Sequence, residues 1–260
     1  MSRIINRVKV YSLYLFEYIR YGELTALRNA FSYMLTGRSF AKGNVMNTGM
    51  GKFETRPGSL DFQYVNYAYE IDIKHFIEKE SFDVYFDIGA CLGEYSIWLG
   101  KKGKKCFAFE PVKESFAMIE KNIRLNNLQE RVKAFNFGLG AKHSIEYFEI
   151  NETNPGANKR VDNEGPHTQK FEIFSLDEKY HLLDLTSSDK ILIKIDVEGM
   201  ETVMLDGAAG FLRNFDNLVL IIEEKLSGDD NIRKKLSSIA NFEYSSIDEF
   251  NICARKLSNK

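Results

Sequence analysis

The hydrophobic positions of the chain alternate between short continuous runs and longer stretches of helical period. The short runs end at Gly, Glu or Asp, as buried parallel strands do, whereas the longer stretches repeat apolar residues every three or four positions. The predicted strands cover residues 84–88, 105–109, 132–137, 191–195 and 218–222, and the predicted helices cover 69–80, 94–100, 112–127, 201–213 and 229–240. This alternation indicates βαβ units and a mostly parallel α/β sheet.

The C-terminal pattern is different. Residues 242–247 and 252–257 are both strand-like, and the segment between them is too short for a crossover helix. The two strands must therefore run antiparallel, as a hairpin that closes the parallel sheet.

Three further regions lie outside the alternating pattern. Residues 1–42 carry seven basic and two acidic side chains among apolar residues at helical spacing, which predicts one or two amphipathic helices. These helices either cap the main domain or a second subunit, or lie on an anionic membrane surface. Residues 43–68 are rich in Gly, Asn and aromatic residues, which predicts short strands and turns. We therefore divide the chain into an N-terminal extension, 1–68, and a Rossmann-like domain, 69–260.

The third region is the polar segment 151–167, which contains Pro and Gly and is long for a connection in a compact domain. We expect it to be either disordered or a functional loop. The runs 145–150 and 171–174 on either side of it predict a small hairpin.

Composition restricts the classes of function. The net charge is −2, so no basic surface indicates a nucleic-acid partner. The three cysteines are Cys91, Cys106 and Cys253, which form no CxxC or Cys/His pattern, so we expect reduced thiols rather than disulfides or zinc. No signal peptide and no long uncharged apolar run is evident, which predicts a cytoplasmic protein.

A glycine-containing turn joins the first strand of the main domain to the helix that follows it. Asp87 precedes Gly89, Ala90 and Gly93, and glycine lets the backbone turn tightly and approach a ligand. A dinucleotide site favours GxGxxG, with pyrophosphate at the helix N-terminus, whereas this turn has GxxxG after an acid. Asp87 would repel a diphosphate and suits a cationic sulfonium and α-ammonium group.

Glu110 directly follows the second of these strands, about 20 residues after Gly89. An acid at that position can bind both hydroxyls of a ribose. Alternatively, Glu110 caps the helix that begins near Val112.

A third motif, residues 194–201, begins at the end of the strand 191–195. Ionisable residues just past an apolar strand are hard to explain by packing, because buried charges are costly unless they are paired. Lys194 either pairs with Asp196 or Glu198 for stability, or one of these acids accepts the proton of a substrate hydroxyl. Carboxylates suit a divalent cation, which the sequence leaves open. The acids that would extend this rim or hold such a cation are Asp177, Asp196, Glu198, Glu223 and Glu224.

These motifs, in this order and spacing, closely resemble those of the FkbM-type methyltransferases. The resemblance runs from about residue 54 to 224 and is carried by residues 87–96, 109–111, 136–140, 175–177 and 194–201, and Arg56, Asp61, Tyr69 and Glu70 are similar to the family's entry segment. A parallel sheet closed by an antiparallel hairpin is also typical of methyltransferases. Cys91 departs from the family, which usually has Asn there.

The resemblance implies a class I methyltransferase fold with a seven-stranded sheet, S-adenosylmethionine as cofactor, and O-methylation of a sugar, a surface-polysaccharide or glycolipid precursor, or a natural product. The implied cofactor-binding residues are Asp87, Gly89, Ala90, Gly93, Glu110, Pro111, Asn136 and Gly138. Lys194, Asp196 and Glu198 would face the reacting centre. The substrate candidates are Arg56, Tyr69, Glu70, His167 and Glu223.

Two other classes of function remain as alternatives. An NAD-dependent oxidoreductase would need the missing GxGxxG and an all-parallel sheet. A non-catalytic scaffold would not need the acidic set at 194–201. The expected partners are a small-molecule or glycan acceptor, a membrane surface contacted through residues 1–42, and a second copy of the chain.

Overall fold

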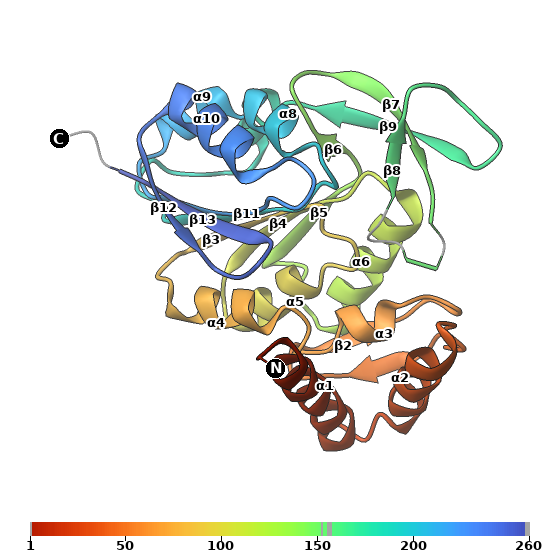
Figure 1. Ribbon diagram of the computed structural model, residues 1–260. Helices are drawn as coiled ribbons and strands as arrows, with labels where there is room; N and C mark the ends of the chain where they lie inside the picture. The colour runs from red at the N-terminus through yellow and green to blue at the C-terminus, as the bar shows by residue number, and fades with distance from the viewer. Residues whose placement is uncertain (1, 152, 155–157, 258–260) are drawn as a thin grey trace.

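The centre of the fold is a seven-stranded sheet in the order β12-β13-β11-β10-β3-β4-β5 (Figure 1). The computed structural model describes residues 2–151, 153–154 and 158–257. The strands are β3 (Val84–Ile88), β4 (Lys105–Phe109), β5 (Val132–Phe135), β10 (Ile191–Ile195), β11 (Leu218–Glu223), β12 (Phe242–Ser246) and β13 (Asn251–Lys256). β13 pairs antiparallel with β11 and β12 and the other pairs are parallel, so the predicted mostly parallel sheet with a C-terminal hairpin is confirmed.

Helices cover both faces of this sheet, so every residue of β3 and β10 is buried. The helices α4 (Ile71–Lys79), α5 (Glu94–Lys101) and α6 (Lys113–Leu125) lie on one face, and α8 (Glu201–Asp206), α9 (Ala209–Asn214) and α10 (Asp229–Ile239) lie on the other (Figure 1). Alternation along β3 places Phe86 and Ile88 in the core with α8–α10 and Tyr85 in the core with α5. Asp87 lies on the same side of β3 as Tyr85, and therefore faces α5.

The predicted single helix 201–213 is wrong, because the chain forms two short helices that separate near Gly207. A Cβ atom at Gly207 would lie 1.9 Å from the carbonyl oxygen of Gly140, so another backbone passes against the chain at this point. The second helix, α9, has its own N-terminal cap. Asp177 lies in α7 (Leu176–Lys179), which the 3₁₀ turn Tyr180–Leu182 follows, and its carboxylate accepts the N–H groups of Gly210 and Phe211 at 2.8 and 2.7 Å.

A second sheet, with strand order β6-β9-β7-β8, is inserted between β5 and β10. Its strands β7 (Ser144–Glu149) and β9 (Thr168–Phe174) form the predicted hairpin, and β6 (Gly138–Leu139) and β8 (Lys159–Val161) were not predicted. The segment 151–167 therefore contains a strand. It also reaches the entry segment, because the N–H of Leu60 donates to the carbonyl of Thr153 at 3.0 Å.

The N-terminal extension packs on the main domain. It consists of α1 (Ser2–Arg20), α2 (Leu24–Thr36), the strand pair β1 (Val45–Asn47) and β2 (Lys52–Glu54), and α3 (Asp61–Tyr64), at one end of the molecule (Figure 1). Tyr18 is buried in the same apolar cluster as Tyr85, and its hydroxyl donates to the carbonyl of Phe62 at 2.8 Å. The predicted boundary between residues 68 and 69 stays a prediction. Within the described residues no helix has the length and hydropathy that a membrane span requires.

Two buried acids hold the N-terminal helices to the turn that follows β1. Glu17 accepts the N–H of Gly49, and Glu23 accepts the N–H of Asn47, both at 2.7 Å. These are the only acidic residues among positions 1–42, and both are turned inward. The outer surface of the two helices therefore carries almost none of their negative charge.

We predict that Glu17→Ala lowers the free energy of unfolding by about 1–3 kcal/mol, because the N–H of Gly49 loses its charged acceptor. Glu17→Gln keeps an acceptor oxygen at that position and should lose less. Urea denaturation of the three proteins checks this expectation. Equal stability of wild type and Glu17→Ala would contradict it.

Candidate functional site

The candidate site lies where the sheet reverses its direction of growth. The chain proceeds from β3 to β4 and β5 on one side and returns to β10 on the other side of β3, and ligands of α/β sheets bind at such a point, beyond the carboxyl ends of the strands. Two cavities open there, an apolar cleft of about 650 Å³ and a polar cavity of about 810 Å³. They share Gly89, Cys91, Asp196 and Glu198, so these four residues mark the junction of the two cavities.

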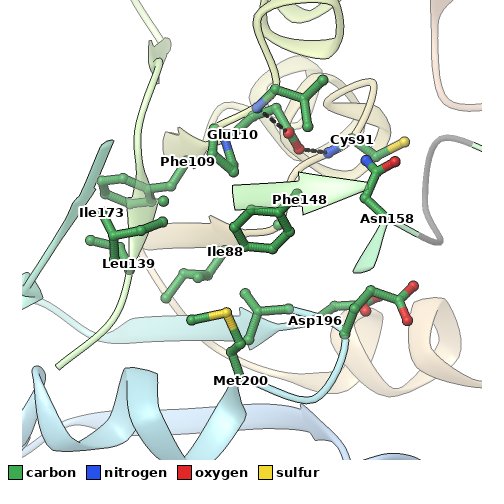
Figure 2. Close-up of a pocket in the computed structure, with 16 residues that line it drawn as sticks. Ile88, Cys91, Phe109, Glu110, Leu139, Phe148, Asn158, Ile173, Asp196 and Met200 are labelled. Atoms are coloured by element: carbon green, nitrogen blue, oxygen red, sulfur yellow. Dashed lines mark hydrogen bonds between the residues drawn. The ribbon is translucent and has the colours of Figure 1, made fainter. Parts of the chain in front are cut away.

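The apolar cleft lies between the sheet and the inserted strands. Figure 2 shows Phe109, Leu139 and Ile173 gathered at one end, and Cys91, Asn158 and Asp196 at the other. Glu110 is the charged group along the β4 side of the cleft. A ligand with an apolar ring at one end and polar groups at the other would match this distribution.

Gly89 is required where the two strand ends touch. Its φ is +86°, and a Cβ atom there would lie 1.9 Å from the carbonyl oxygen of Asp196. The N–H of Asp196 in turn donates to the carbonyl of Ile88 at 3.0 Å. The glycine turn and the acidic loop are therefore in direct backbone contact.

Cys91 adopts a left-handed conformation, with φ of +49°. Asn is several-fold enriched among non-glycine residues in this region of φ and ψ, so a cysteine here is uncommon. The N–H of Cys91 donates to Oε2 of Glu110 at 2.9 Å, so the turn keeps its backbone contact despite the substitution. Ala90 and Gly93 shape the same turn but do not line either cavity.

Glu110 is buried and holds two backbone N–H groups, those of Cys91 and Val112, both at 2.9 Å. Burial raises the pKa of Glu110 to about 7, although both N–H groups counteract the shift. Each carboxylate oxygen keeps a second lone pair, which suits the two hydroxyls of a ribose. Asn136 supports this segment, because its Nδ2 donates to the carbonyls of Glu110 and Pro111 at 3.0 Å. Pro111 and Gly138 line the cleft, whereas Asn136 does not.

Asp87 lines the polar cavity and is almost fully buried. The hydroxyl and the N–H of Ser96 donate to its Oδ2 at 2.7 and 3.2 Å, and the Tyr85 hydroxyl donates to Oδ1 at 3.3 Å. Burial raises the pKa of Asp87 to about 6, against the lowering effect of Ser96 and of the Lys194 charge. Asp87 therefore anchors the first turn of α5 and also adds negative charge to the cavity wall.

Lys194 is paired in register with Asp87 across β3 and β10. Its Nζ lies 2.7 Å from Oδ2 of Asp196 and 3.9 Å from Oε2 of Glu70. Burial alone would lower the pKa of Lys194, but the charges of Asp196 and Glu70 outweigh it and raise that pKa well above its usual value. The predicted ion pair is present, and Lys194 stays protonated between the acids.

Glu198 lies at the junction of the cavities in a left-handed conformation, with φ of +50°. Among the described residues its carboxylate has no ion pair and no side-chain hydrogen bond. Burial and the Asp196 charge raise the pKa of Glu198 to about 7. Burial and the charges of Asp196 and Glu198 likewise raise the pKa of Glu223, which lines the polar cavity.

Glu201 fixes the loop that carries Glu198, a role the sequence did not reveal. It is fully buried, and its Oε1 accepts the N–H groups of Val197 and Gly199 at 3.3 and 3.0 Å. Its other oxygen accepts the hydroxyl of Ser227. Glu201 is thus the positioning residue of the acidic loop.

The polar cavity also contains residues that were not predicted. Glu94 begins α5, is buried, and its Oε2 has no hydrogen-bond partner among the described residues. Burial and the Asp87 charge raise the pKa of Glu94. Glu94 could have been predicted as a site residue, because it directly follows the GxxxG turn. Tyr64 and Asn154 hydrogen-bond each other across the cavity wall. The sequence does not predict this contact, because the two residues lie 90 positions apart.

Tyr69 and Glu70 line the polar cavity as predicted substrate candidates, but other candidates lie elsewhere. Arg56 forms a bidentate pair with the buried Asp61, at 2.9 Å for both contacts, and lines neither cavity. His167 is exposed and lines neither cavity. Asp177 and Glu224 also lie outside both, Asp177 because it caps α9. Among the described residues no group of three or more His, Cys, Asp or Glu side chains could hold a metal ion.

Comparison with known families identifies the chain. The model described as "Methyltransferase FkbM domain" matches residues 87–245, more than half of the 260 residues, so the protein belongs to the FkbM methyltransferase family. The predicted family is confirmed. A search of curated proteins gave no match.

Several solved structures are similar to the chain. They include an FkbM methyltransferase from Methylobacillus flagellatus KT (15% identity, covering 75% of this chain and 53% of that chain, TM-score 0.47). A precorrin-6y C5,15-methyltransferase from Geobacter metallireducens GS-15 is 16% identical, with 72% of this chain and 89% of that chain covered and a TM-score of 0.41. A Pyrococcus abyssi tRNA (uracil-54, C5)-methyltransferase in complex with S-adenosyl-L-homocysteine is 10% identical, with 83% of this chain and 44% of that chain covered and a TM-score of 0.44. The chain thus spans about half the length of the Methylobacillus protein.

Two glycines with almost the same positive φ allow the contact at Gly89 to be tested. Gly103 has φ of +87°, and a Cβ atom there would meet nothing within 4 Å. We predict that Gly103→Ala costs about 1–2 kcal/mol of stability, the strain of a left-handed residue. Gly89→Ala should cost at least about 1–3 kcal/mol more, because its Cβ also displaces the carbonyl of Asp196. Chemical denaturation of both variants measures the difference, and equal losses would refute the steric argument.

Proposed function

We propose that the protein is an S-adenosylmethionine-dependent methyltransferase that methylates a hydroxyl group of a sugar or surface-glycan precursor. The observation that carries the proposal is the meeting of the apolar cleft with the acidic cavity at Gly89 and Glu198. Membership of the FkbM family supports methyl transfer as the reaction. The free thiols of all three cysteines are consistent with a reducing, cytoplasmic environment.

The residues present fit the cofactor. An adenine ring would pack among Phe109, Leu139 and Ile173, and Glu110 would accept the hydroxyls of the ribose. Oε2 of Glu94, which has no hydrogen-bond partner among the residues that the structure describes, would face the cationic methionyl end together with Asp87. When bound, S-adenosylmethionine supplies an electrophilic methyl group on a sulfonium. The same acids disfavour the diphosphate of NAD.

The polar cavity supports a neutral, hydroxyl-rich acceptor. Carboxylates accept hydrogen bonds from hydroxyl groups, and the cavity contains Glu70, Asp87, Glu94, Asp196, Glu198 and Glu223 against Lys194 and Lys225. Tyr64 and Tyr69 form an aromatic wall, with ring centroids 5.1 Å apart. The acidic excess disfavours a negatively charged reacting group. A hydroxylated natural product would satisfy the same contacts, and acceptor assays separate the two.

Glu198 is the better candidate for the general base. Oδ2 of Asp196 is already engaged by Nζ of Lys194 at 2.7 Å. Glu198 lacks such a partner among the described residues, and its pKa of about 7 suits proton transfer near neutral pH. Lys194 would keep Asp196 and Glu70 in place. The main task of the site is then to align the acceptor oxygen with the methyl group.

We predict that S-adenosylhomocysteine stabilises the protein against heat and that NAD does not. Ligand at about 100 times its dissociation constant stabilises by about 2.7 kcal/mol, which corresponds to a rise in Tm of roughly 5–11 °C. Glu110→Ala should abolish the rise, because the ribose loses its acceptors. Glu114→Ala removes an exposed acid from the first turn of α6 and should leave the rise intact. A rise in Tm with NAD alone would favour the oxidoreductase. No rise with either ligand would favour the non-catalytic scaffold.

We predict that Glu198→Gln lowers kcat about 10²–10⁴-fold without changing the affinity for S-adenosylhomocysteine. The wild-type rate should increase with pH up to about 7, because the base must be deprotonated to accept a proton. Transfer of labelled methyl groups to a panel of neutral and phosphorylated sugars and hydroxylated aromatic compounds provides the assay. Asp196→Asn serves as the comparison. If Glu198→Gln retains the wild-type rate and pH profile, Glu198 is not the base.

A further inference from the structure

The outer surface of the two N-terminal helices is apolar and basic. More than half of the exposed large hydrophobic side chains of the described residues, nine of sixteen, belong to residues 11–42. They are Tyr11, Leu13, Phe16, Ile19, Leu24, Phe31, Met34, Leu35 and Phe40. Exposure of this extent in one segment marks a surface that is covered by a partner. We call the exposed side chains of residues 11–42 the N-terminal outer face.

The hydrophobic side chains of this face follow the helical repeat. In α2, Leu24, Arg28, Phe31 and Leu35 are all exposed at spacings of three and four residues, and Leu35 is 85% exposed. In α1, Phe16 and Ile19 are both 62% exposed, whereas Tyr18 is buried in the core. The inner faces of both helices are thus already packed against the rest of the protein. The hydrophobic side chains of the N-terminal outer face would need a separate partner to be buried.

The charge of the face is of one sign. Its cations are Arg20, Arg28, Arg38 and Lys42, all exposed. The only two acids of the segment, Glu17 and Glu23, are buried because they hold the turn after β1. A symmetric dimer through this face would place the cations of two copies against each other without an acid from residues 11–42 to pair them. The complementary partner is therefore anionic as well as apolar.

We propose that the N-terminal outer face binds the surface of an anionic lipid bilayer. The aliphatic and aromatic side chains would enter the boundary between headgroups and acyl chains, and the four cations would contact the anionic headgroups. Both helices lie at one end of the molecule, away from α9, α10 and the inserted sheet, so a flat surface can reach them (Figure 1). This proposal does not depend on the proposed methyl transfer.

Co-sedimentation of the full chain with vesicles tests the proposal. We expect binding to vesicles of phosphatidylcholine with phosphatidylglycerol, weaker binding to phosphatidylcholine alone, and loss of the difference at high salt. Arg28→Glu combined with Arg38→Glu should lower the partition coefficient on the anionic vesicles at least about 25-fold, since each cation contributes about fivefold. Phe31→Ser combined with Leu35→Ser should lower it at least about tenfold on both vesicle types.

Matched controls use side chains of the same kind elsewhere on the surface. Leu182→Ser removes a leucine that is 51% exposed, and Lys234→Glu reverses an exposed charge on α10, so neither should change vesicle binding. Unchanged unfolding temperatures show that the variants fold. Absence of vesicle binding by the wild type would overturn the proposal, as would equal losses in the control variants. A dimer in analytical ultracentrifugation that Phe31→Ser with Leu35→Ser dissociates, without vesicle binding, would assign the face to a second copy.

Discussion

The backbone contact between Gly89 and Asp196 is the constraint on which the site depends. Parallel pairing of β3 with β10 continues to the N–H of Asp196, which donates to Ile88, and the carbonyl of Asp196 then lies against the α-carbon of Gly89. This contact leaves no room for a side chain, and it joins the glycine turn to the acidic loop. The apolar cleft and the polar cavity therefore meet at one point, and the reacting groups can be brought together there without a change in the sheet.

The acids around this point are held where burial disfavours their charge. Burial raises the pKa values of Asp87, Glu110 and Glu198 to about 6, 7 and 7, although Ser96, backbone N–H groups and Lys194 counteract it. Such groups lower the stability of a protein unless a ligand compensates them, and they cluster at functional sites for this reason. Lys194 satisfies Asp196 and Glu70, and Glu201 is satisfied by backbone and Ser227. Within the part of the chain that the structure describes, Oε2 of Glu94 has no hydrogen-bond partner and the Glu198 carboxylate has no ion pair.

The sequence predicted those parts of the molecule that depend on local pattern. Buried strands such as 84–88 and 191–195 are continuous apolar runs, and the motif order identified the family. Features set by distant contacts were not predictable. The break near Gly207 depends on the backbone of Gly140, and the wall of the polar cavity depends on Asn154 reaching Tyr64. Arg56 pairs with Asp61, and His167 lies outside both cavities. Neither position could be predicted, because no periodic pattern in the sequence shows in which direction these side chains point.

The division of the site between segments determines how its specificity can evolve. The proposed cofactor side is built from strand ends and the glycine turn, where the carbonyl of Asp196 leaves no room for a side chain at Gly89. The polar cavity, which is the proposed acceptor side, takes Tyr64 and Tyr69 from the entry segment, Asn154 from the inserted loop and Lys225 from beyond β11. Substitutions at these four positions leave the sheet and the turn untouched. On the proposed assignment, a different acceptor would therefore require changes only in these peripheral segments, and the strand ends that hold Gly89 against Asp196 would stay as they are.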